Sequence, residues 1–268
     1  MRDLALRESL FAGEVLTEAP TVAQRSLVAR ARALLTAALD LADPAIAHTR
    51  YPTPELLARI SRARAEIRRD PVIAEHTLAI ARSIGFSQGS LLLDLPRLRA
   101  IAPNMASVPS AAPALYAHRD CWYANPQAQL NAWIALYDAP ATTGFAIFRD
   151  RFTAAVANDS ERFELQRFVQ RGGFQSRSVR PNDSAHVDYP RALDEGALGP
   201  AYTVTPRHAW LTLFSASHVH QTHAHAESMT RFSLDFRLVH RDDRVSGRGA
   251  PNVDNRAIGD ASEDYLAC

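Results

Sequence analysis

Four histidines lie close together in the last quarter of the chain, and an alternating segment follows them. They are His218, His220, His223 and His225. Imidazole is a common metal ligand, so this cluster could supply a ligand to a metal site. From residue 230 to 239 polar and apolar residues alternate, which is the period of a half-buried strand. One side of that predicted strand carries more charge than an ordinary core tolerates: Arg231, Ser233, Asp235 and Arg237.

Further ligands could come from a His-x-Asp sequence, because residues two apart on a strand point to the same side. The chain contains three such pairs: His118 with Asp120, His186 with Asp188, and His240 with Asp242. No histidine follows the third pair, and the second lies in a turn-like stretch between prolines. The first pair ends a predicted strand and leaves several strands before the histidine cluster. We therefore select His118 and Asp120.

Each of the four clustered histidines could supply the third ligand, and the spacing to an arginine favours one of them. A ligand on one strand and an arginine on the next antiparallel strand face each other across a short connection. His220 and Arg231 are eleven residues apart, and Ser233 shares the inward side with Arg231. His218, two residues before His220, is expected to contact His220 without binding the metal itself. His223 and His225 are expected to take no part in the site.

This arrangement resembles the iron(II)- and 2-oxoglutarate-dependent oxygenases, in particular the phytanoyl-CoA dioxygenase-like group. The matching features are His118-x-Asp120, the distal His220 and Arg231. The stretch 129–138 followed by 144–148 is similar to the strand pair that follows His-x-Asp in that group. Residues 118–127 and 230–237 are similar to a branch found in natural-product and antibiotic biosynthesis. The resemblance covers roughly residues 90–255, and it departs at 223–225, where the family usually has Pro-Asn after the histidine.

The resemblance implies a complete set of roles. His118, Asp120 and His220 would bind Fe(II) and leave three positions for 2-oxoglutarate and O2. Arg231, with a hydroxyl from Ser233 or Thr222, would hold the distal carboxylate of 2-oxoglutarate. Beyond these roles, we expect Asn104, Asn131 and Trp133 to line the co-substrate pocket, with ordinary strand packing as the alternative. Substrate binding is expected for Arg237, Trp122 and Tyr123, with structural roles as the alternative. The implied reaction is hydroxylation, desaturation or oxidative cyclisation of a small polar metabolite, with release of succinate and CO2. A carboxylate ligand at Asp120 argues against halogenation.

The same residues are also compatible with structural roles and with two further classes of protein. His118 and Asp120 could form a hydrogen-bonded core pair, Arg231 could pair with Asp235, and Arg237 could have a structural partner. A zinc- or manganese-dependent jelly-roll isomerase or hydrolase would use the same three ligands but would not need Arg231. A non-catalytic jelly-roll module that binds small molecules would leave the whole constellation unexplained.

The elements that must position these residues change in character along the chain. Helices are predicted at 22–41, 53–69 and 72–83, where prolines and capping residues mark the boundaries. Only a short strand or turn is expected before them, around 11–16. Strands are predicted at 91–101, 114–120, 129–137, 144–149, 203–205, 209–215 and 230–239. Helices followed by many short strands favour a mainly β fold with flanking helices, a double-stranded β-helix (jelly roll) whose N-terminal helices buttress one sheet.

We expect one domain over residues 1–268. It would comprise a mostly helical segment at 1–88, a jelly-roll core at 89–240 and a polar tail at 241–268. An insertion at 150–201 with a helix near 160–170 interrupts the strands, and insertions of this kind are commonly substrate loops. The tail could fold over the mouth of the site or be loosely ordered.

Composition excludes several classes of protein. The 268 residues carry 30 basic and 29 acidic side chains, so no nucleic-acid or membrane surface is indicated and a small-molecule partner is expected. Every basic residue is arginine, and the absence of lysine excludes Schiff-base and P-loop chemistry. Cys121 and Cys268 are expected to be free thiols. With no leader-like or membrane-spanning segment, the expected location is the cytoplasm. Composition does not indicate an oligomeric state.

Overall fold

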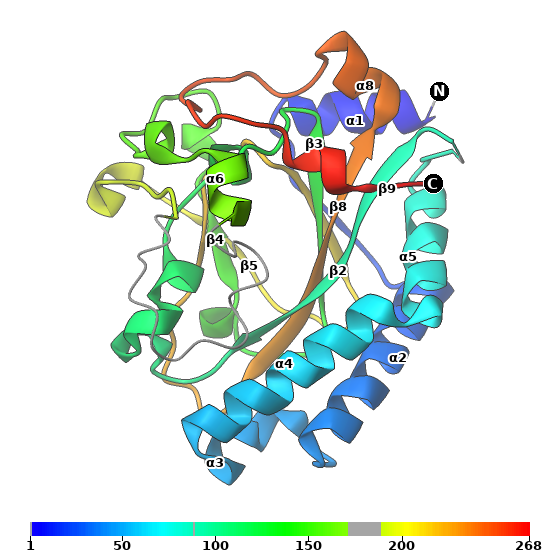
Figure 1. The fold of residues 1–268 in the computed structure, drawn as a ribbon, viewed down its shortest axis with the longest axis vertical. Coiled ribbons are helices and arrows are strands. Elements are labelled where there is room, and N and C mark those ends of the chain that lie inside the picture. Colours follow the sequence, from blue (N-terminus) through cyan, green and yellow to red (C-terminus); the bar gives the residue numbers. More distant parts are fainter. Residues whose placement is uncertain (1, 88, 171–188) are drawn as a thin grey trace.

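The computed structural model describes residues 2–87, 89–170 and 189–268, and it combines helices with two antiparallel sheets (Figure 1). The larger sheet has the order β1-β6-β3-β8-β2-β9, and the smaller one has the order β5-β4-β7. The larger sheet is built from β1 (Leu16–Glu18), β2 (Leu91–Ile101), β3 (Gln129–Ala135), β6 (Leu211–Ser215), β8 (Arg231–His240) and β9 (Leu266–Ala267). The smaller sheet is built from β4 (Phe145–Ile147), β5 (Tyr202–Val204) and β7 (His220–Thr222).

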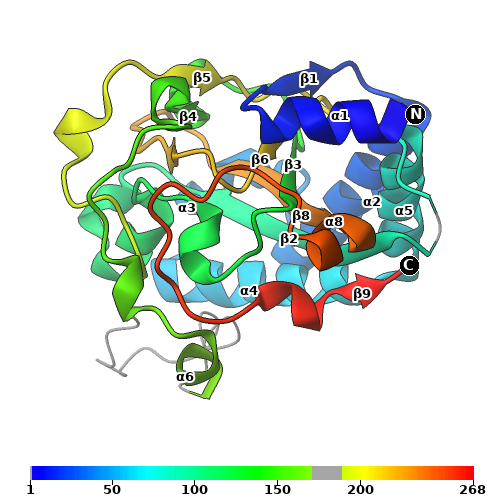
Figure 2. The same cartoon turned by 90° about the horizontal axis from the view of Figure 1, so that it is seen from above.

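Three long helices cover one face of the larger sheet (Figures 1 and 2). They are α2 (Val22–Leu39), α4 (Thr53–Arg69) and α5 (Pro71–Ser83). Each begins where the sequence predicts: Thr21 and Gln24 form a capping box before α2, and the Asp70 side chain accepts a hydrogen bond from the backbone N–H of Ile73 at the start of α5. The buttress of N-terminal helices predicted from the sequence is therefore confirmed.

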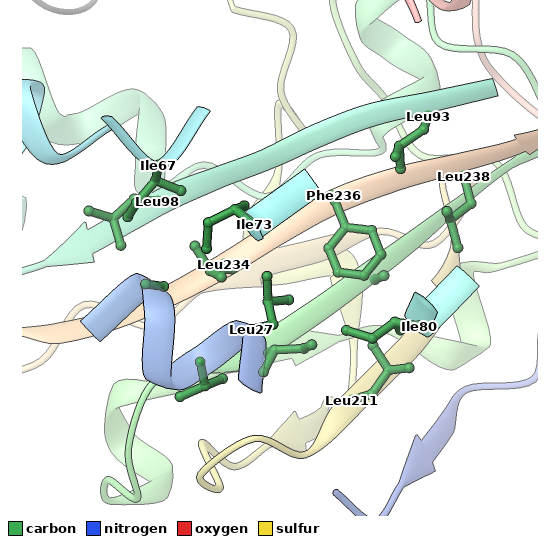
Figure 3. Packing of buried hydrophobic residues seen from close by; sticks show 14 of the residues in the cluster. Leu27, Ile67, Ile73, Ile80, Leu93, Leu98, Leu211, Leu234, Phe236 and Leu238 are labelled. Atoms are coloured by element: carbon green, nitrogen blue, oxygen red, sulfur yellow. The ribbon is translucent and has the colours of Figure 1, made fainter. Parts of the chain in front are cut away.

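The main core lies between these helices and the sheet (Figure 3). Leu27, Ile67 and Ile80 of the helices belong to one buried cluster with Leu234 and Phe236 of β8, and all five are completely buried. Removing such side chains from water is the dominant stabilising contribution to a fold of this size. The opposite face of β8, which carries its charged residues, points away from the helices and toward the smaller sheet.

A bulge in β2 sets which of its side chains share that second face. Asp94 pairs with Arg237 and Arg97 pairs with Asp235, so two residues of β2, Leu95 and Pro96, lie opposite a single residue of β8. A proline fits here because it has no N–H to contribute to the ladder. As a result Asp94 and Arg97 lie on the same face although they are three residues apart.

Short elements complete the fold. The remaining helices are α1 (Arg2–Phe11), α3 (Ala47–Arg50), α6 (Leu165–Gln170) and α8 (Arg241–Ser246). The 3-10 turns are η1 (Pro44–Ile46), η2 (Met105–Ser107), η3 (Pro109–Leu115), η4 (Asp120–Tyr123), η5 (Ala141–Thr143), η6 (Arg149–Arg151), η7 (Ser160–Arg162), η8 (Glu195–Leu198) and η9 (Ala261–Asp264). No helix in the described part of the chain combines the length and the apolarity needed to cross a membrane.

Several predicted elements differ from the structure. The strand expected at 114–120 is wrong, because this segment consists of the end of η3, an isolated bridge at His118 and the start of η4. Helix α1 occupies the beginning of the chain, where only a short strand or turn was expected. The tail is not a loosely ordered terminus, because it forms α8, η9 and the edge strand β9.

Candidate functional site

A cavity of about 140 Å³ lies between the two sheets, and the selected histidines and aspartate line it. His118 and His220 are joined by an isolated antiparallel bridge: the N–H of each donates to the carbonyl of the other, at 3.0 and 2.9 Å. Residues that exchange both hydrogen bonds lie directly opposite each other, so their side chains are neighbours. The backbone thus brings together two histidines that are about a hundred residues apart in sequence.

His118, Asp120 and His220 form the group of possible metal ligands in the described part of the chain. One ligand atom from each lies within 4.8 Å of the others. The Oδ1 atom of Asp120 is 3.4 Å from Nε2 of His118 and 3.9 Å from Nε2 of His220. Two imidazoles and one carboxylate on one side of an ion leave the other side open, which is the arrangement found in non-haem iron oxygenases.

Both histidines are held in the same way. Nδ1 of His118 lies 2.8 Å from the carbonyl oxygen of Tyr116, and Nδ1 of His220 lies 3.0 Å from that of His218. Each Nδ1 therefore carries the proton, and each Nε2 presents its lone pair to the shared space. Burial, and then the neighbouring His118, lowers the pKa of His220 to about 4, which keeps its imidazole neutral and able to bind a metal.

The Asp120 carboxylate is stabilised in its charged form. Burial by itself opposes ionisation, but the positive charge of Arg237 and the neighbouring His118 hold the pKa of this carboxyl well below its usual range. Nε of Arg237 lies 3.7 Å from Oδ2 of Asp120, and Gln129 Nε2 donates to the same oxygen at 3.4 Å. Arg237 is also one of the residues expected to bind substrate. In the structure this side chain already has structural partners, because besides facing Asp120 its Nη1 pairs with Asp94 at 2.8 Å.

Arg231 enters the same cavity from β8 and is almost completely buried. Its Nε donates to the carbonyl of Thr143 at 3.0 Å, and its Nη1 donates to Ser233 Oγ at 2.6 Å. No carboxylate among the described residues forms an ion pair with Arg231, since Asp235 is held by Arg99 instead. Burial lowers the pKa of Arg231 to about 10. A buried cation without an anion is costly, so this guanidinium is suited to bind an anionic ligand.

The other residues predicted for co-substrate binding are divided by the structure. Asn131, Trp133 and Thr222 line the cavity. Ser233 does not line it, but its Oγ accepts a hydrogen bond from Arg231, which does. Asn104 is not among the lining residues. It occupies a left-handed backbone position after β2, where its N–H donates to the carbonyl of His225 at 2.8 Å.

The two aromatic residues predicted to bind substrate point in different directions. Tyr123 lines the cavity and packs edge-on against the His118 ring at 5.1 Å between centroids. Trp122 is completely buried elsewhere, and its Nε1 donates to Asp254 Oδ1 at 2.8 Å. Trp122 therefore does not line this cavity, because the 3-10 turn η4 directs neighbouring side chains to different sides.

The remaining histidines do not line the cavity. His218 supports His220 as predicted, but through its backbone carbonyl, while its buried ring packs against Phe152 at 4.5 Å. His223 lies on an outer groove, and His225 is bonded through Nε2 to the carbonyl of Ile101. His186 and Asp188, the second of the three His-x-Asp pairs, lie outside the described residues.

Sequence reasoning missed three features of this site: Arg97 and Arg99 on β2, Tyr189 on the cavity wall, and Asp254 in the tail. The two arginines fall in a predicted strand, two residues apart, and this was the available signal for an inward-facing pair. Asp254 carried no such signal, because its partners lie more than ninety residues away.

Comparison with known proteins gives distant structural similarities. No protein-family model and no curated protein matches the chain. Solved structures that resemble it include the apo form of ThoJ, a non-heme monooxygenase (15% identity, TM-score 0.45, 95% of this chain and 89% of that one). SnoN, described as a non-heme alpha ketoglutarate dependent epimerase from nogalamycin biosynthesis, has 17% identity, a TM-score of 0.43, and coverage of 88% and 84%.

A third similar structure is EvdO2 from Micromonospora carbonacea var. aurantiaca, with 11% identity and a TM-score of 0.43. The alignment covers 66% of this chain and 62% of EvdO2, so the chain spans less than two thirds of that protein's length. All three TM-scores are below 0.5, so the proposals below rest on the residues of this chain.

Proposed function

We propose that this chain is an Fe(II)- and 2-oxoglutarate-dependent oxygenase that oxidises a C–H bond of a small polar metabolite. The outcome would be hydroxylation, desaturation or oxidative cyclisation, with release of succinate and CO2, in natural-product biosynthesis. The observation that carries the proposal is the presence, in one cavity, of a two-histidine, one-carboxylate group and a buried arginine that has no carboxylate partner among the described residues.

The donor set supports iron as the resident metal. Two imidazoles and one carboxylate suit divalent first-row metals, and the nitrogen atoms that would bind the ion are already oriented by carbonyl oxygens. Fe(II) with 2-oxoglutarate supplies the means to activate O2 and remove a hydrogen atom from a substrate. Asp120, as the carboxylate ligand, would occupy a coordination position that a halide would need, so halogenation is not part of the proposal.

The chain itself would bind and orient the co-substrate. Arg231 presents its guanidinium inside the cavity, where a planar fork of N–H donors matches a carboxylate. Its Nε and Nη1 are fixed by Thr143 and Ser233, so the guanidinium is held in place before a ligand arrives. Thr222 and Trp133 form neighbouring walls, and Asn131 adds a polar group.

The arrangement of the sheets supports a more specific fold. We propose that the six-stranded and three-stranded sheets form a double-stranded β-helix with the cavity between them, and that residues 1–268 form one domain. The three ligands would then lie at one end of this arrangement, on the His118–His220 bridge and on the first residue of η4.

A spectroscopic and a turnover assay test the proposed function. Anaerobic addition of Fe(II) and 2-oxoglutarate should produce a weak visible charge-transfer band, and admission of air should release succinate. The variant His118→Ala should lose both signals. The variant Arg231→Gln should need roughly ten- to a hundredfold more 2-oxoglutarate, because it loses a charge-assisted pair.

Arg207→Gln is a matched control for the Arg231 variant. Both guanidiniums lie over a tryptophan ring, Arg231 at 5.7 Å from Trp133 and Arg207 at 5.2 Å from Trp210, but Arg207 is exposed on the surface. The control should keep the wild-type requirement for 2-oxoglutarate. The alternative is a metal-dependent isomerase or hydrolase. It would be identified if the wild-type protein gave no charge-transfer band and its metal-dependent turnover did not require 2-oxoglutarate.

A further inference from the structure

Two arginines of β2 face the cavity in addition to the two of β8. Arg97 and Arg99 lie opposite Asp235 and Ser233 in the ladder between β2 and β8, and both line the cavity together with Arg231 and Arg237. Their side chains are 25% and 33% exposed, compared with 11% for Arg237. Arg97 and Arg99 are therefore the two guanidiniums of this group that a ligand entering from solvent reaches first.

Arg99 has an acidic partner of its own, whereas the acidic partner of Arg97 is shared with other arginines. Arg99 forms a two-point pair with Asp235, at 2.6 and 2.9 Å. Arg97 pairs with Asp94 at 2.7 Å, but the same Asp94 oxygen also accepts from Arg237 at 2.8 Å. The single charge of Asp94 is thus divided between these two guanidiniums and that of Arg68, whose Nη1 lies 3.5 Å from the other oxygen of Asp94. A carboxylate that is shared in this way compensates each cation only partly.

The charges around the cavity do not balance among the described residues. Four arginines line it, and the acidic groups that contact them or the ligands are three: Asp94, Asp120 and Asp235. A divalent metal and doubly charged 2-oxoglutarate would cancel each other, and metal-bound imidazoles would add no charge. Counted over the described residues alone, the guanidiniums around the cavity exceed these carboxylates by one. Positive charge in a partly closed cavity attracts anions and increases their rate of entry.

The electrostatic environment of Arg97 agrees with this count. Burial, and next the like charge of Arg237, lowers the pKa of Arg97 to about 10. An anion placed beside Arg97 would reverse the effect of Arg237 and stabilise the charged guanidinium. The position lies close to the reaction centre, because Arg97, Asp94, Arg237 and Asp120 form a continuous chain of ion pairs to the metal ligands.

An aromatic wall lies on the side of the cavity that carries His118. Tyr123 and Tyr189 line it, with ring centroids 6.1 Å apart, and Phe163 and Phe168 pack behind them. Aromatic faces of this kind favour a flat or apolar portion of a ligand. The cavity thus offers a cationic wall on β2 and an aromatic wall beside the ligands.

We propose that the prime substrate carries an anionic group, a carboxylate or a phosphate, and that Arg97 and Arg99 bind this group. The proposal rests on the proposed oxygenase function, since it assigns the metal and 2-oxoglutarate to the remainder of the cavity. The anion would fix one end of the substrate on β2, and its less polar portion would lie against Tyr123 and Tyr189, near His118.

Matched pairs of small aromatic compounds test the proposal. Phenylacetate and the neutral phenylacetamide have nearly the same shape, and phenyl phosphate provides the second anion class. Their affinities can be measured by ligand-observed NMR on the Zn(II)·2-oxoglutarate complex, which is diamagnetic and does not turn over. Phenylacetate should bind at least about tenfold more tightly than the amide, the effect expected of a charge-assisted hydrogen bond. The relative affinity of phenyl phosphate indicates which anion the site prefers.

The preference should depend on Arg97. Arg97→Gln should reduce the ratio to near one, and Arg97→Lys should retain part of it because the charge is kept. Arg59→Gln is the matched control: Arg59 has a 24% exposed side chain and pairs with Glu55 four residues away, much as Arg97 pairs with Asp94, but it lies on α4. This control should keep the wild-type ratio.

Salt provides a measurement that needs no variant. The affinity for phenylacetate should fall as NaCl is added, whereas the affinity for phenylacetamide should change little. Equal affinities for the two compounds, failure of both to bind, or a preference that persists in Arg97→Gln and Arg99→Gln would overturn the proposal. Failure of the oxygenase function is recognised separately, by the absence of the Fe(II)·2-oxoglutarate absorption band in the wild-type protein.

Discussion

Asp254 in the C-terminal tail holds the segment that carries two of the candidate ligands. Arg119, between His118 and Asp120, is 1% exposed, and its Nε lies 3.0 Å from Oδ1 of Asp254. Asp254 also accepts hydrogen bonds from Trp122 Nε1 at 2.8 Å and from the backbone N–H of Val156 at 2.9 Å. One carboxylate thus ties the tail to the ligand segment and to the segment after η6.

The substitution Asp254→Asn removes the charge and keeps the shape. Breaking a buried ion pair on one side costs about 3 to 5 kcal/mol. The lower end applies here, because the Arg119 guanidinium keeps the carbonyls of Arg151 and Ala154, at 2.7 and 2.9 Å, as acceptors. We therefore expect the free energy of unfolding of the metal-free protein to fall by about 3 kcal/mol in a urea titration.

A control in the same tail distinguishes this effect from loss of any charge. Arg256 pairs with Glu161 at 2.7 Å, but both side chains are about half exposed, so Glu161→Gln should cost at most about 1 kcal/mol. Asp254→Asn should also weaken the binding of Co(II) or Fe(II), by roughly tenfold, since His118 and Asp120 lose their support. Equal stability of the two variants would refute the role assigned to Asp254.

Four other predictions concern the same site. Gly144→Ala should destabilise the protein by at least about 2 kcal/mol in urea unfolding, because a Cβ there would meet the carbonyl oxygen of Val204 at 2.1 Å. Between pH 6.5 and 4 the stability of the metal-free protein should fall as the pH falls. Burial lowers the pKa of His218 to about 4, so the unfolded chain binds a proton that the folded one does not. The free energy of unfolding should therefore decrease by up to roughly 1.4 kcal/mol for each pH unit. This slope should be smaller in His218→Gln. Added Fe(II) or Co(II) should raise the melting temperature of the wild type but not of His118→Ala. Tyr265→Phe should cost about 1 kcal/mol in the same urea titration, because its hydroxyl donates to Gln129 Oε1 at 2.7 Å.

Elements with strong local patterns could be predicted from the sequence. Strand β2 begins and ends where the pattern indicates, and so does α4, because hydrophobic periodicity and prolines act locally. The sequence also predicts that His118, Asp120 and His220 lie together, and in the structure one ligand atom from each lies within 4.8 Å of the others. These features depend on residue types and spacing that can be read without knowing the packing.

The remaining features depend on contacts between distant parts of the chain. Strand β7 has only three residues, and its pairing with β4 and the bridge to His118 define it, so its own sequence gave little signal. The 3-10 turn η4 decides that Tyr123 faces the cavity and Trp122 does not. Alternation within a strand could not reveal this, because the ligand segment is not a strand.

The bulge at Leu95 and Pro96 has a consequence for comparing this chain with other proteins. The extra residue is absorbed between Asp94 and Arg97, so a relative with a regular strand would need one residue fewer to place equivalent side chains in its cavity. An ungapped alignment through β2 would then match inward-facing residues on one side of the bulge with outward-facing residues of the relative. A single-residue gap at positions 95–96 restores the correspondence, and shared cavity residues before Pro96 become visible only when it is introduced.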